Sequence, residues 1–331
     1  MPFDPVIILD KCVMQTLSRE ESIVLHNCYT VNSVPLLHRE IRGDLKKPSK
    51  RSTPQDEVKI IAQKHILRNS VVNVHYLRLL RGSLLDEVFP LDGRAIVPGN
   101  WVRAVNGECG VIYEETTEEQ DLSRWRRGEF SLFDTLMAET WRQSTKSFDM
   151  ETYKRDLVQS FSNSKPPVAI KDIRRLLFFL DEALKSESSQ HRYLEFLLWV
   201  FAIHFPETVR LRWGREGRPL LRDFAPYAFH YFRVALFFHL ALIYDLIGTR
   251  PTNRVDVEYL FYLPFCTVFS SDDKFLKQLC PLFLRKDQRF LDTQTLKREL
   301  SETVSKPLSA PKYGEGWSDL PGGKAEESPR V

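Results

Sequence analysis

Two apolar runs, one near each end of the chain, stop abruptly on carboxylates. In PVIILDKCV (5–13) the run ends on Asp10, and VEYLFYLPFCTVFSSDDKFLKQL (257–279) is almost unbroken until Asp272 and Asp273. Short continuous apolar runs are typical of parallel strands that are covered on both faces. We therefore expect a buried strand near each end of the chain, followed at once by acidic side chains.

The N-terminal region alternates strands with helices. After the apolar run at 6–9, Ser18 and Glu21 have the spacing of a capping box, which predicts the start of a helix. A short extended piece at 29–31 follows, and Pro35, a residue suited to the first position of a helix, opens the next one. Alternation of this kind is typical of an α/β fold.

The same alternation returns after residue 253. Asp256 begins an apolar helix, residues 267–269 are expected to form a short strand, and residues 273–280 another helix. A last edge strand is expected at 289–291. Both ends of the chain therefore have an α/β pattern.

The middle of the chain has a different, mainly helical pattern. A loop rich in Pro, Ser and basic residues at 46–54 precedes a stretch with helical spacing at 56–82. Glycine and β-branched residues at 92–114 indicate a small hairpin. Further helices are expected at about 129–161, 168–186, 189–206 and 224–247.

These patterns predict an α/β fold with an open parallel sheet, assembled from both chain ends and flanked by helices. Residues 1–50 and 250–304 would form this domain, and residues 51–249 a large, mainly α-helical insertion. Residues 305–331 are rich in Pro, Gly, Ser and charge, which predicts a disordered tail.

Cysteine usage and the N-terminus indicate a reducing, cytoplasmic compartment. The chain has five cysteines without C-x-x-C spacing, which predicts neither a disulfide framework nor a zinc site. MPFDPVIILD lacks the basic start of a secretory signal. The apolar stretch 227–247 has the length of a membrane span, but Arg233, two histidines and Asp245 interrupt it, and such residues are costly in a bilayer. We expect a core helix there and no membrane span.

The acidic residues at the two chain ends are candidates for a metal site. The carboxyl ends of neighbouring parallel strands meet at one edge of a sheet, where α/β proteins place their ligands. Carboxylates gathered there repel one another unless a cation lies between them. A set of oxygen ligands without His or Cys suits Mg²⁺ or Mn²⁺. The candidate ligands are Asp10, Glu40, Asp256, Asp272 and Asp273.

These segments resemble the motifs of PIN-domain nucleases. IILDKCV is similar to the family's first strand with its Asp, and VPLLHREI to its second-helix motif with its Glu. DVEYLFY and VFSSDDKF are similar to its third and fourth acidic motifs, and Ser270 or Ser271 takes the place of the family's hydroxyl residue. The likeness covers about residues 1–46 and 250–300. It implies a PIN-like domain in which Asp10, Glu40 and Asp256, with Asp272 or Asp273, are catalytic metal ligands.

The resemblance implies a metal-dependent nuclease that hydrolyses phosphodiesters, with single-stranded RNA as the expected substrate. The chain departs from the family pattern where Lys11 and Cys12 replace an Asn or Ser, and Lys11 can itself pair with a carboxylate. The alternative is therefore a catalytically inactive PIN-like scaffold or protein-interaction module. In either case the helical insertion is expected to control substrate access or to bind a regulatory protein.

Basic residues near the acidic motifs are candidates for binding nucleic-acid phosphates. One group directly follows the Glu40 helix, and a second surrounds a Trp that could stack on a base. The alternative for both groups is an ordinary solvated surface. The candidate residues are Lys46, Lys47, Lys50, Arg51, Arg212, Trp213 and Arg215.

Overall fold

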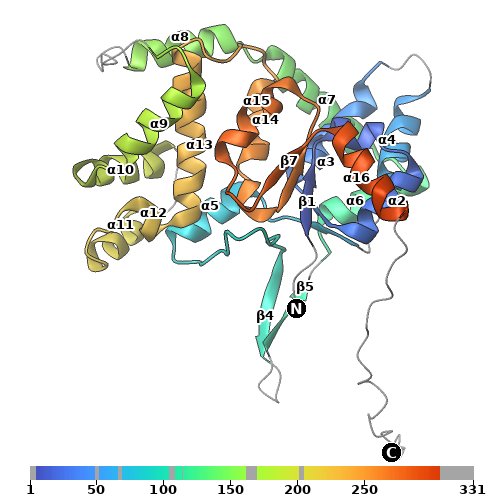
Figure 1. The fold of residues 1–331 in the computed structure, drawn as a ribbon, viewed down its shortest axis with the longest axis horizontal. Coiled ribbons are helices and arrows are strands. Elements are labelled where there is room, and N and C mark those ends of the chain that lie inside the picture. Colours follow the sequence, from blue (N-terminus) through green and yellow to red (C-terminus); the bar gives the residue numbers. More distant parts are fainter. Residues whose placement is uncertain are drawn as a thin grey trace, which may run out of the picture.

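A five-stranded parallel sheet joins the two ends of the chain (Figure 1). The structure is a computed structural model that describes residues 5–48, 52–65, 69–103, 109–113, 115–161, 170–200 and 205–305. The strand order is β3-β2-β1-β6-β7. The strands are β1 (Val6–Leu9), β2 (Thr30–Ser33), β3 (Ser70–Val72), β6 (Val268–Ser270) and β7 (Arg289–Leu291).

Strand β1 lies in the centre of this sheet, between β2 and β6. All four of its residues are buried, as the continuous apolar run predicts. Its register with β6 pairs Ile8 with Phe269 and Leu9 with Ser270, and the backbone N–H of Asp10 donates to the carbonyl of Ser270 at 3.0 Å. The expectation of an α/β fold with a parallel sheet is therefore confirmed, and because β1 and β6 are neighbours, the acidic residues after them emerge at the same edge.

Helices from both chain ends cover the sheet (Figure 1). The capping box of Ser18 and Glu21 is present at the start of α2, and Pro35 is at the start of α3, as predicted. The helices are α1 (Lys11–Thr16), α2 (Arg19–Cys28), α3 (Pro35–Gly43), α4 (Pro54–Lys64), α14 (Asn253–Leu260), α15 (Lys274–Phe283) and α16 (Thr293–Ser305), with short 3-10 turns η1 (Asp44–Lys46) and η4 (Leu263–Phe265).

The middle of the chain is mainly helical and includes the expected hairpin, β4 (Gly99–Arg103) with β5 (Cys109–Tyr113). Helix α7 packs against α3, and therefore reaches the sheet domain. The helices of this part are α5 (Tyr76–Leu84), α6 (Thr117–Arg127), α7 (Leu132–Ser147), α8 (Met150–Phe161), α9 (Ile173–Leu184), α10 (Gln190–Val200), α11 (Pro206–Arg215), α12 (Leu221–Phe224) and α13 (Pro226–Ile243), with η3 (Glu187–Ser189).

The continuous helical stretch predicted at 56–82 is wrong, because β3 interrupts it between α4 and α5. Strand β3 pairs with β2, so the sheet also takes one strand from the range assigned to the insertion. The division into a domain of 1–50 and 250–304 and an insertion of 51–249 stays a prediction. The predicted tail, apart from Ser305 at the end of α16, lies outside the described residues.

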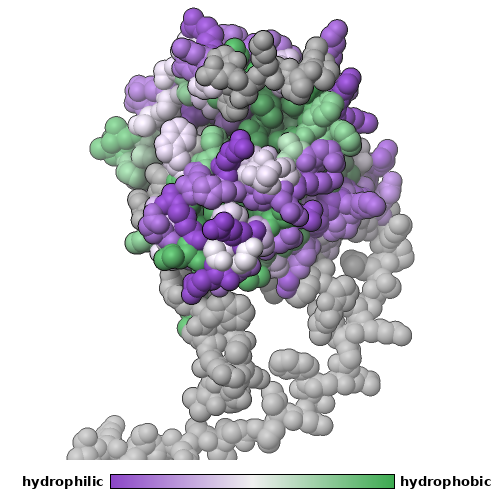
Figure 2. Space-filling view, turned by 90° about the vertical axis from the view of Figure 1, so that its left-hand side faces the viewer, coloured by the Kyte–Doolittle hydropathy of each residue, from purple (hydrophilic) through white to green (hydrophobic). Residues whose placement is uncertain are grey.

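Helix α13 is, within the described ranges, the one helix long and apolar enough to cross a membrane by length and composition. Half of its apolar window is buried inside the molecule, and it packs against α5, α8, α9, α12 and α14. A core helix of this kind meets the same criteria of length and composition. Figure 2 looks onto the side of the molecule that carries α9 to α12, where hydrophilic residues predominate and hydrophobic areas lie between them.

Candidate functional site

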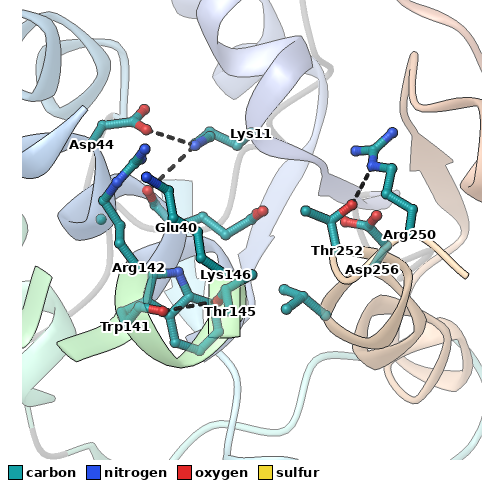
Figure 3. A pocket seen from close by; sticks show the side chains of 12 residues that line it. Lys11, Glu40, Asp44, Trp141, Arg142, Thr145, Lys146, Arg250, Thr252 and Asp256 are labelled. Carbon is teal, nitrogen blue, oxygen red and sulfur yellow. Dashed lines mark hydrogen bonds and ion pairs between the residues drawn. The ribbon is translucent and has the colours of Figure 1, made fainter. Parts of the chain in front are cut away.

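A cavity of about 360 Å³ opens between α3, α7 and α14, next to the carboxyl end of β1 (Figure 3). Three of its side chains carry carboxylates, those of Glu40, Asp44 and Asp256, and four carry positive charge. The residues that line it are Lys11, Glu40, Gly43, Asp44, Trp141, Arg142, Thr145, Lys146, Arg250, Thr252, Val255 and Asp256.

Glu40 lies on α3, and its carboxylate accepts a hydrogen bond of 2.6 Å from the hydroxyl of Tyr259. Tyr259 is completely buried on α14, so this bond fixes the Glu40 side chain from the opposite helix. Burial, and then the nearby carboxylate of Asp10, raise the pKa of Glu40 to about 7. The Glu40 carboxyl group therefore keeps its proton to higher pH than an ordinary glutamic acid does.

Asp256 lies within the first turn of α14, where it is 8% exposed. The cap position belongs to Thr252, so Asp256 is not the cap of this helix. One carboxylate oxygen of Asp256 is buried without a hydrogen-bond partner. Burial, followed by the carboxylates of Glu40, Asp273 and Asp10, raises the pKa of Asp256 to about 8. These carboxylates therefore lie close enough to repel one another.

Asp10 lies at the end of β1 and is held by two side-chain donors. Its Oδ2 accepts a hydrogen bond of 2.7 Å from the Ser271 hydroxyl and one of 2.9 Å from the Cys12 thiol. Burial, and then Asp10, raise the pKa of the Cys12 thiol to about 12, so the thiol remains protonated and can donate. Ser271, one of the two predicted hydroxyl residues, thus orients the Asp10 carboxylate.

The adjacent residues Asp272 and Asp273 point to different surroundings. The Asp272 carboxylate forms an ion pair of 3.0 Å with Lys277 and accepts from the backbone N–H of Thr293. Asp273 caps α15, and its Oδ2 lies 3.8 Å from an Arg250 nitrogen. Because Arg250 lines the cavity, Asp273 is the member of the pair that lies beside a cavity residue.

The metal ligands predicted from the sequence are not gathered into a finished metal centre. Within the ranges that the structure describes, no three His, Cys, Asp or Glu side chains lie close enough together to hold a metal ion. The chemistry of the side chains nevertheless suits a hard divalent cation, since their donors are carboxylate oxygens and Asp256 keeps an unpartnered buried oxygen. Their mutual repulsion is what such a cation relieves.

Lys11 is already paired beside the cavity. Its ammonium group lies 2.9 Å from Oδ1 of Asp44 and 3.4 Å from the backbone carbonyl of Glu40 (Figure 3). The sequence allowed Lys11 to pair with a carboxylate, and the partner is Asp44 rather than Asp10, Glu40 or Asp256. Lys11 therefore forms its ion pair with Asp44, and its charge only partly offsets the effect of burial on the pKa of Glu40.

The predicted phosphate-binding residues after α3 differ in their contacts and exposure. Lys46 forms an ion pair of 3.4 Å with Glu139, and Lys47 is exposed. Lys50 and Arg51 lie outside the described residues.

The structure contradicts the predicted stacking role of Trp213. Its ring is 6% exposed and its indole N–H donates to the carbonyl of Pro219, so no ring face is free for a base. Arg212 is also engaged, because its guanidinium donates to the carbonyls of Ser83 and Leu84. Arg215 is exposed and lines a separate pocket beside Arg212.

Sequence reasoning missed the residues of α7 that line the cavity. Trp141, Arg142, Thr145 and Lys146 come from the middle of the chain, and nothing in their spacing marks a binding site. They reach the cavity because α7 packs against α3, where Gly43 leaves room for the Trp141 ring. A Cβ at Gly43 would lie 2.8 Å from that ring.

Comparisons of the chain with protein-family models, with curated proteins and with solved structures gave no match.

Proposed function

We propose that the chain is a PIN-like, metal-dependent phosphodiester hydrolase that cleaves RNA. The observation that carries this proposal is the pair of buried carboxylates, Glu40 and Asp256, which line one cavity, where burial and neighbouring carboxylates raise the pKa of both. The resemblance of both chain ends to PIN-domain motifs supports it. So does the parallel sheet, in which the residues that follow β1 and β6 emerge at one edge.

Four carboxylates are the proposed ligands of Mg²⁺ or Mn²⁺: Asp10, Glu40, Asp256 and Asp273. When bound, such an ion would lower the pKa of a coordinated water and hold phosphate oxygens. Tyr259 holds Glu40 in position, and Ser271 and Cys12 hold Asp10. Asp272 is left out of this set because Lys277 and Thr293 occupy its carboxylate.

Cleavage of labelled single-stranded RNA and DNA, with Mn²⁺, Mg²⁺ or EDTA, tests the proposal. We expect Mn²⁺ and Mg²⁺ to support cleavage of RNA by the wild type and EDTA to abolish it. Asp256→Asn should lose cleavage, whereas the matched control Asp272→Asn should retain it. A wild type that is inert with either ion on both substrates, or an Asp256→Asn variant as active as the wild type, would refute the hydrolase.

The second candidate is a catalytically inactive PIN-like scaffold. Two observations favour it: the described carboxylates are not gathered around one point, and Lys11 is salt-bridged to Asp44 at the edge of the cavity. A scaffold of this kind would show neither cleavage nor a rise in melting temperature with Mn²⁺. A regulatory protein that binds the helical insertion and a cytoplasmic location stay predictions under either candidate.

A further inference from the structure

Two cations of α7 line the cavity. Arg142 and Lys146 are one helical turn apart, so they lie on the same side of α7. Both line the cavity, and neither forms a hydrogen bond or an ion pair with any residue that the structure describes. Figure 3 shows both side chains rising from α7 toward the cavity.

The other cations around the cavity are compensated. Lys11 is paired with Asp44, and Arg250 lies beside Asp273. Lys46, at the end of η1, is paired with Glu139. Arg142 and Lys146 are therefore the lining cations, among the described residues, whose charge is still available to an anion.

Packing holds α7, which carries these two cations, beside the cavity. The Trp141 ring lies against Gly43 on α3, and Thr145 donates to the carbonyl of Trp141 one turn earlier. Arg142 directly follows Trp141 along the helix, and Lys146 directly follows Thr145. Helix α7 thus holds two positive charges opposite the carboxylates that would bind the divalent cation.

We propose that Arg142 and Lys146 bind the phosphodiester backbone of a single-stranded nucleic acid whose neighbouring phosphate lies at the carboxylate site. This inference rests on the proposed function. Lysine and arginine supply the sequence-independent part of nucleic-acid binding through phosphate contacts. A cavity of about 360 Å³ has the size of pockets that enclose small ligands, so it takes a nucleotide-sized part of one strand and not a duplex.

The test is the affinity for labelled single-stranded oligonucleotides, measured by fluorescence anisotropy over a range of salt concentrations. EDTA and Ca²⁺ would be compared, with RNA, DNA and duplex RNA as ligands. The variant is Arg142→Gln/Lys146→Gln. Its matched control is Arg174→Gln/Arg192→Gln, which removes the same charge from exposed positions on α9 and α10.

We expect the α7 variant to bind single strands at least about tenfold more weakly, because it removes two of the charges that bind phosphates. The slope of log affinity against log salt should fall in magnitude by about 1.4, because each phosphate contact on a single strand contributes about 0.7. The control should bind as the wild type does. The charge-conserving variant Arg142→Lys/Lys146→Arg should keep the wild-type slope.

An α7 variant that binds as tightly as its control, or a wild type that binds no single strand or prefers the duplex, would overturn the inference. The proposed function fails separately, through the cleavage assay. If the α7 variant cleaves RNA as the wild type does, the phosphate contacts proposed for Arg142 and Lys146 are refuted, and the hydrolase is not. If the wild type binds single strands through α7 but shows no metal-dependent cleavage, the hydrolase is refuted and the protein is a single-strand-binding module.

Discussion

Two clusters of buried carboxylates flank α3, and they differ in what neutralises them. On one side, Asp121 and Asp134 are bound by Arg42 of α3 and by Arg124 of α6. On the other side, Glu40 and Asp256 face the cavity. Lys11 also lines this cavity, but its ion pair is with Asp44. Both clusters consist of buried carboxylates, but in the first cluster each carboxylate is paired with arginines.

The pKa directions show the same contrast. Burial alone would raise the pKa of Asp134, but the hydrogen bonds from Arg124 and Ser131 hold that pKa below its ordinary value. Burial and neighbouring carboxylates raise the pKa of Glu40 to about 7 and that of Asp256 to about 8. The Arg-bound cluster therefore stabilises the contact between α3, α6 and α7, whereas the cavity cluster has room for an added cation.

The largest expected effect comes from breaking the Arg-bound cluster. Asp134→Ala removes the fully buried carboxylate that Arg124 and Arg42 share, leaving these arginines only Asp121, and it also removes the capping box of α7. We expect a cost of about 3–5 kcal/mol of unfolding free energy. Urea unfolding followed by circular dichroism measures this cost. Asp156→Ala, at an exposed position on α8, is the control and should unfold as the wild type does. An equal stability of the two variants would show that the arginines do not need Asp134.

The second effect is stabilisation of the cavity cluster by a divalent cation. Binding to the folded state alone contributes about 2.7 kcal/mol when the free ion is at 100 times its dissociation constant. Mn²⁺ should therefore raise the melting temperature of the wild type, and Asp256→Asn should abolish the rise. If Asp256→Asn responds to Mn²⁺ as the wild type does, the ion binds elsewhere.

The third effect is a loss of stability with rising pH in the absence of metal. Glu40 and Asp256 keep their protons to higher pH in the folded protein than in the unfolded chain, whose carboxyl groups titrate near pH 4. Between about pH 4 and pH 8 the folded state therefore binds more protons, and the unfolding free energy falls as pH rises. Each retained proton contributes up to about 1.4 kcal/mol per pH unit.

The comparison of wild type with Glu40→Gln/Asp256→Asn isolates this pH effect. In EDTA, the unfolding free energy of the double variant should decline less between about pH 5 and about pH 8 than that of the wild type. Mn²⁺ should reduce the decline in the wild type. A wild type and variant with parallel pH profiles would show that these carboxylates are not coupled to folding.

The smallest effect is expected at Asp272. Its ion pair with Lys277 is partly exposed, and such pairs contribute at most about 1 kcal/mol. Asp272→Asn should therefore lower the unfolding free energy only slightly and leave the Mn²⁺-dependent rise in melting temperature unchanged. Loss of that rise would place Asp272, rather than Asp273, among the ion's ligands.

The sequence predicted those parts of the fold that local patterns determine. The apolar runs predicted β1 and β6, the Ser18–Glu21 spacing predicted the start of α2, and Pro35 that of α3. Strand β3 was missed because its three residues carry too short a pattern to interrupt the helical spacing on either side. Its pairing with β2 is a long-range contact.

The candidate site was predicted only as far as its acidic residues. The sequence left Asp272 and Asp273 as alternatives, because the direction of each side chain depends on the cap of α15 and on Lys277. Arg142 and Lys146 join the cavity through packing of α7 on α3, which no local pattern encodes. Trp213 was predicted to lie in the site, but tertiary packing buries its ring. The basic, polar stretch around it in the sequence does not indicate this burial.

The most direct test of the central claim is a crystal structure of the protein grown with Mn²⁺, with anomalous diffraction to locate the ion. We predict one anomalous peak or two adjacent peaks in the cavity, coordinated by Glu40 and Asp256 together with Asp10 or Asp273. Crystals with full Mn²⁺ exposure but no peak in the cavity, and with Glu40 and Asp256 still facing each other without a cation, would contradict the claim.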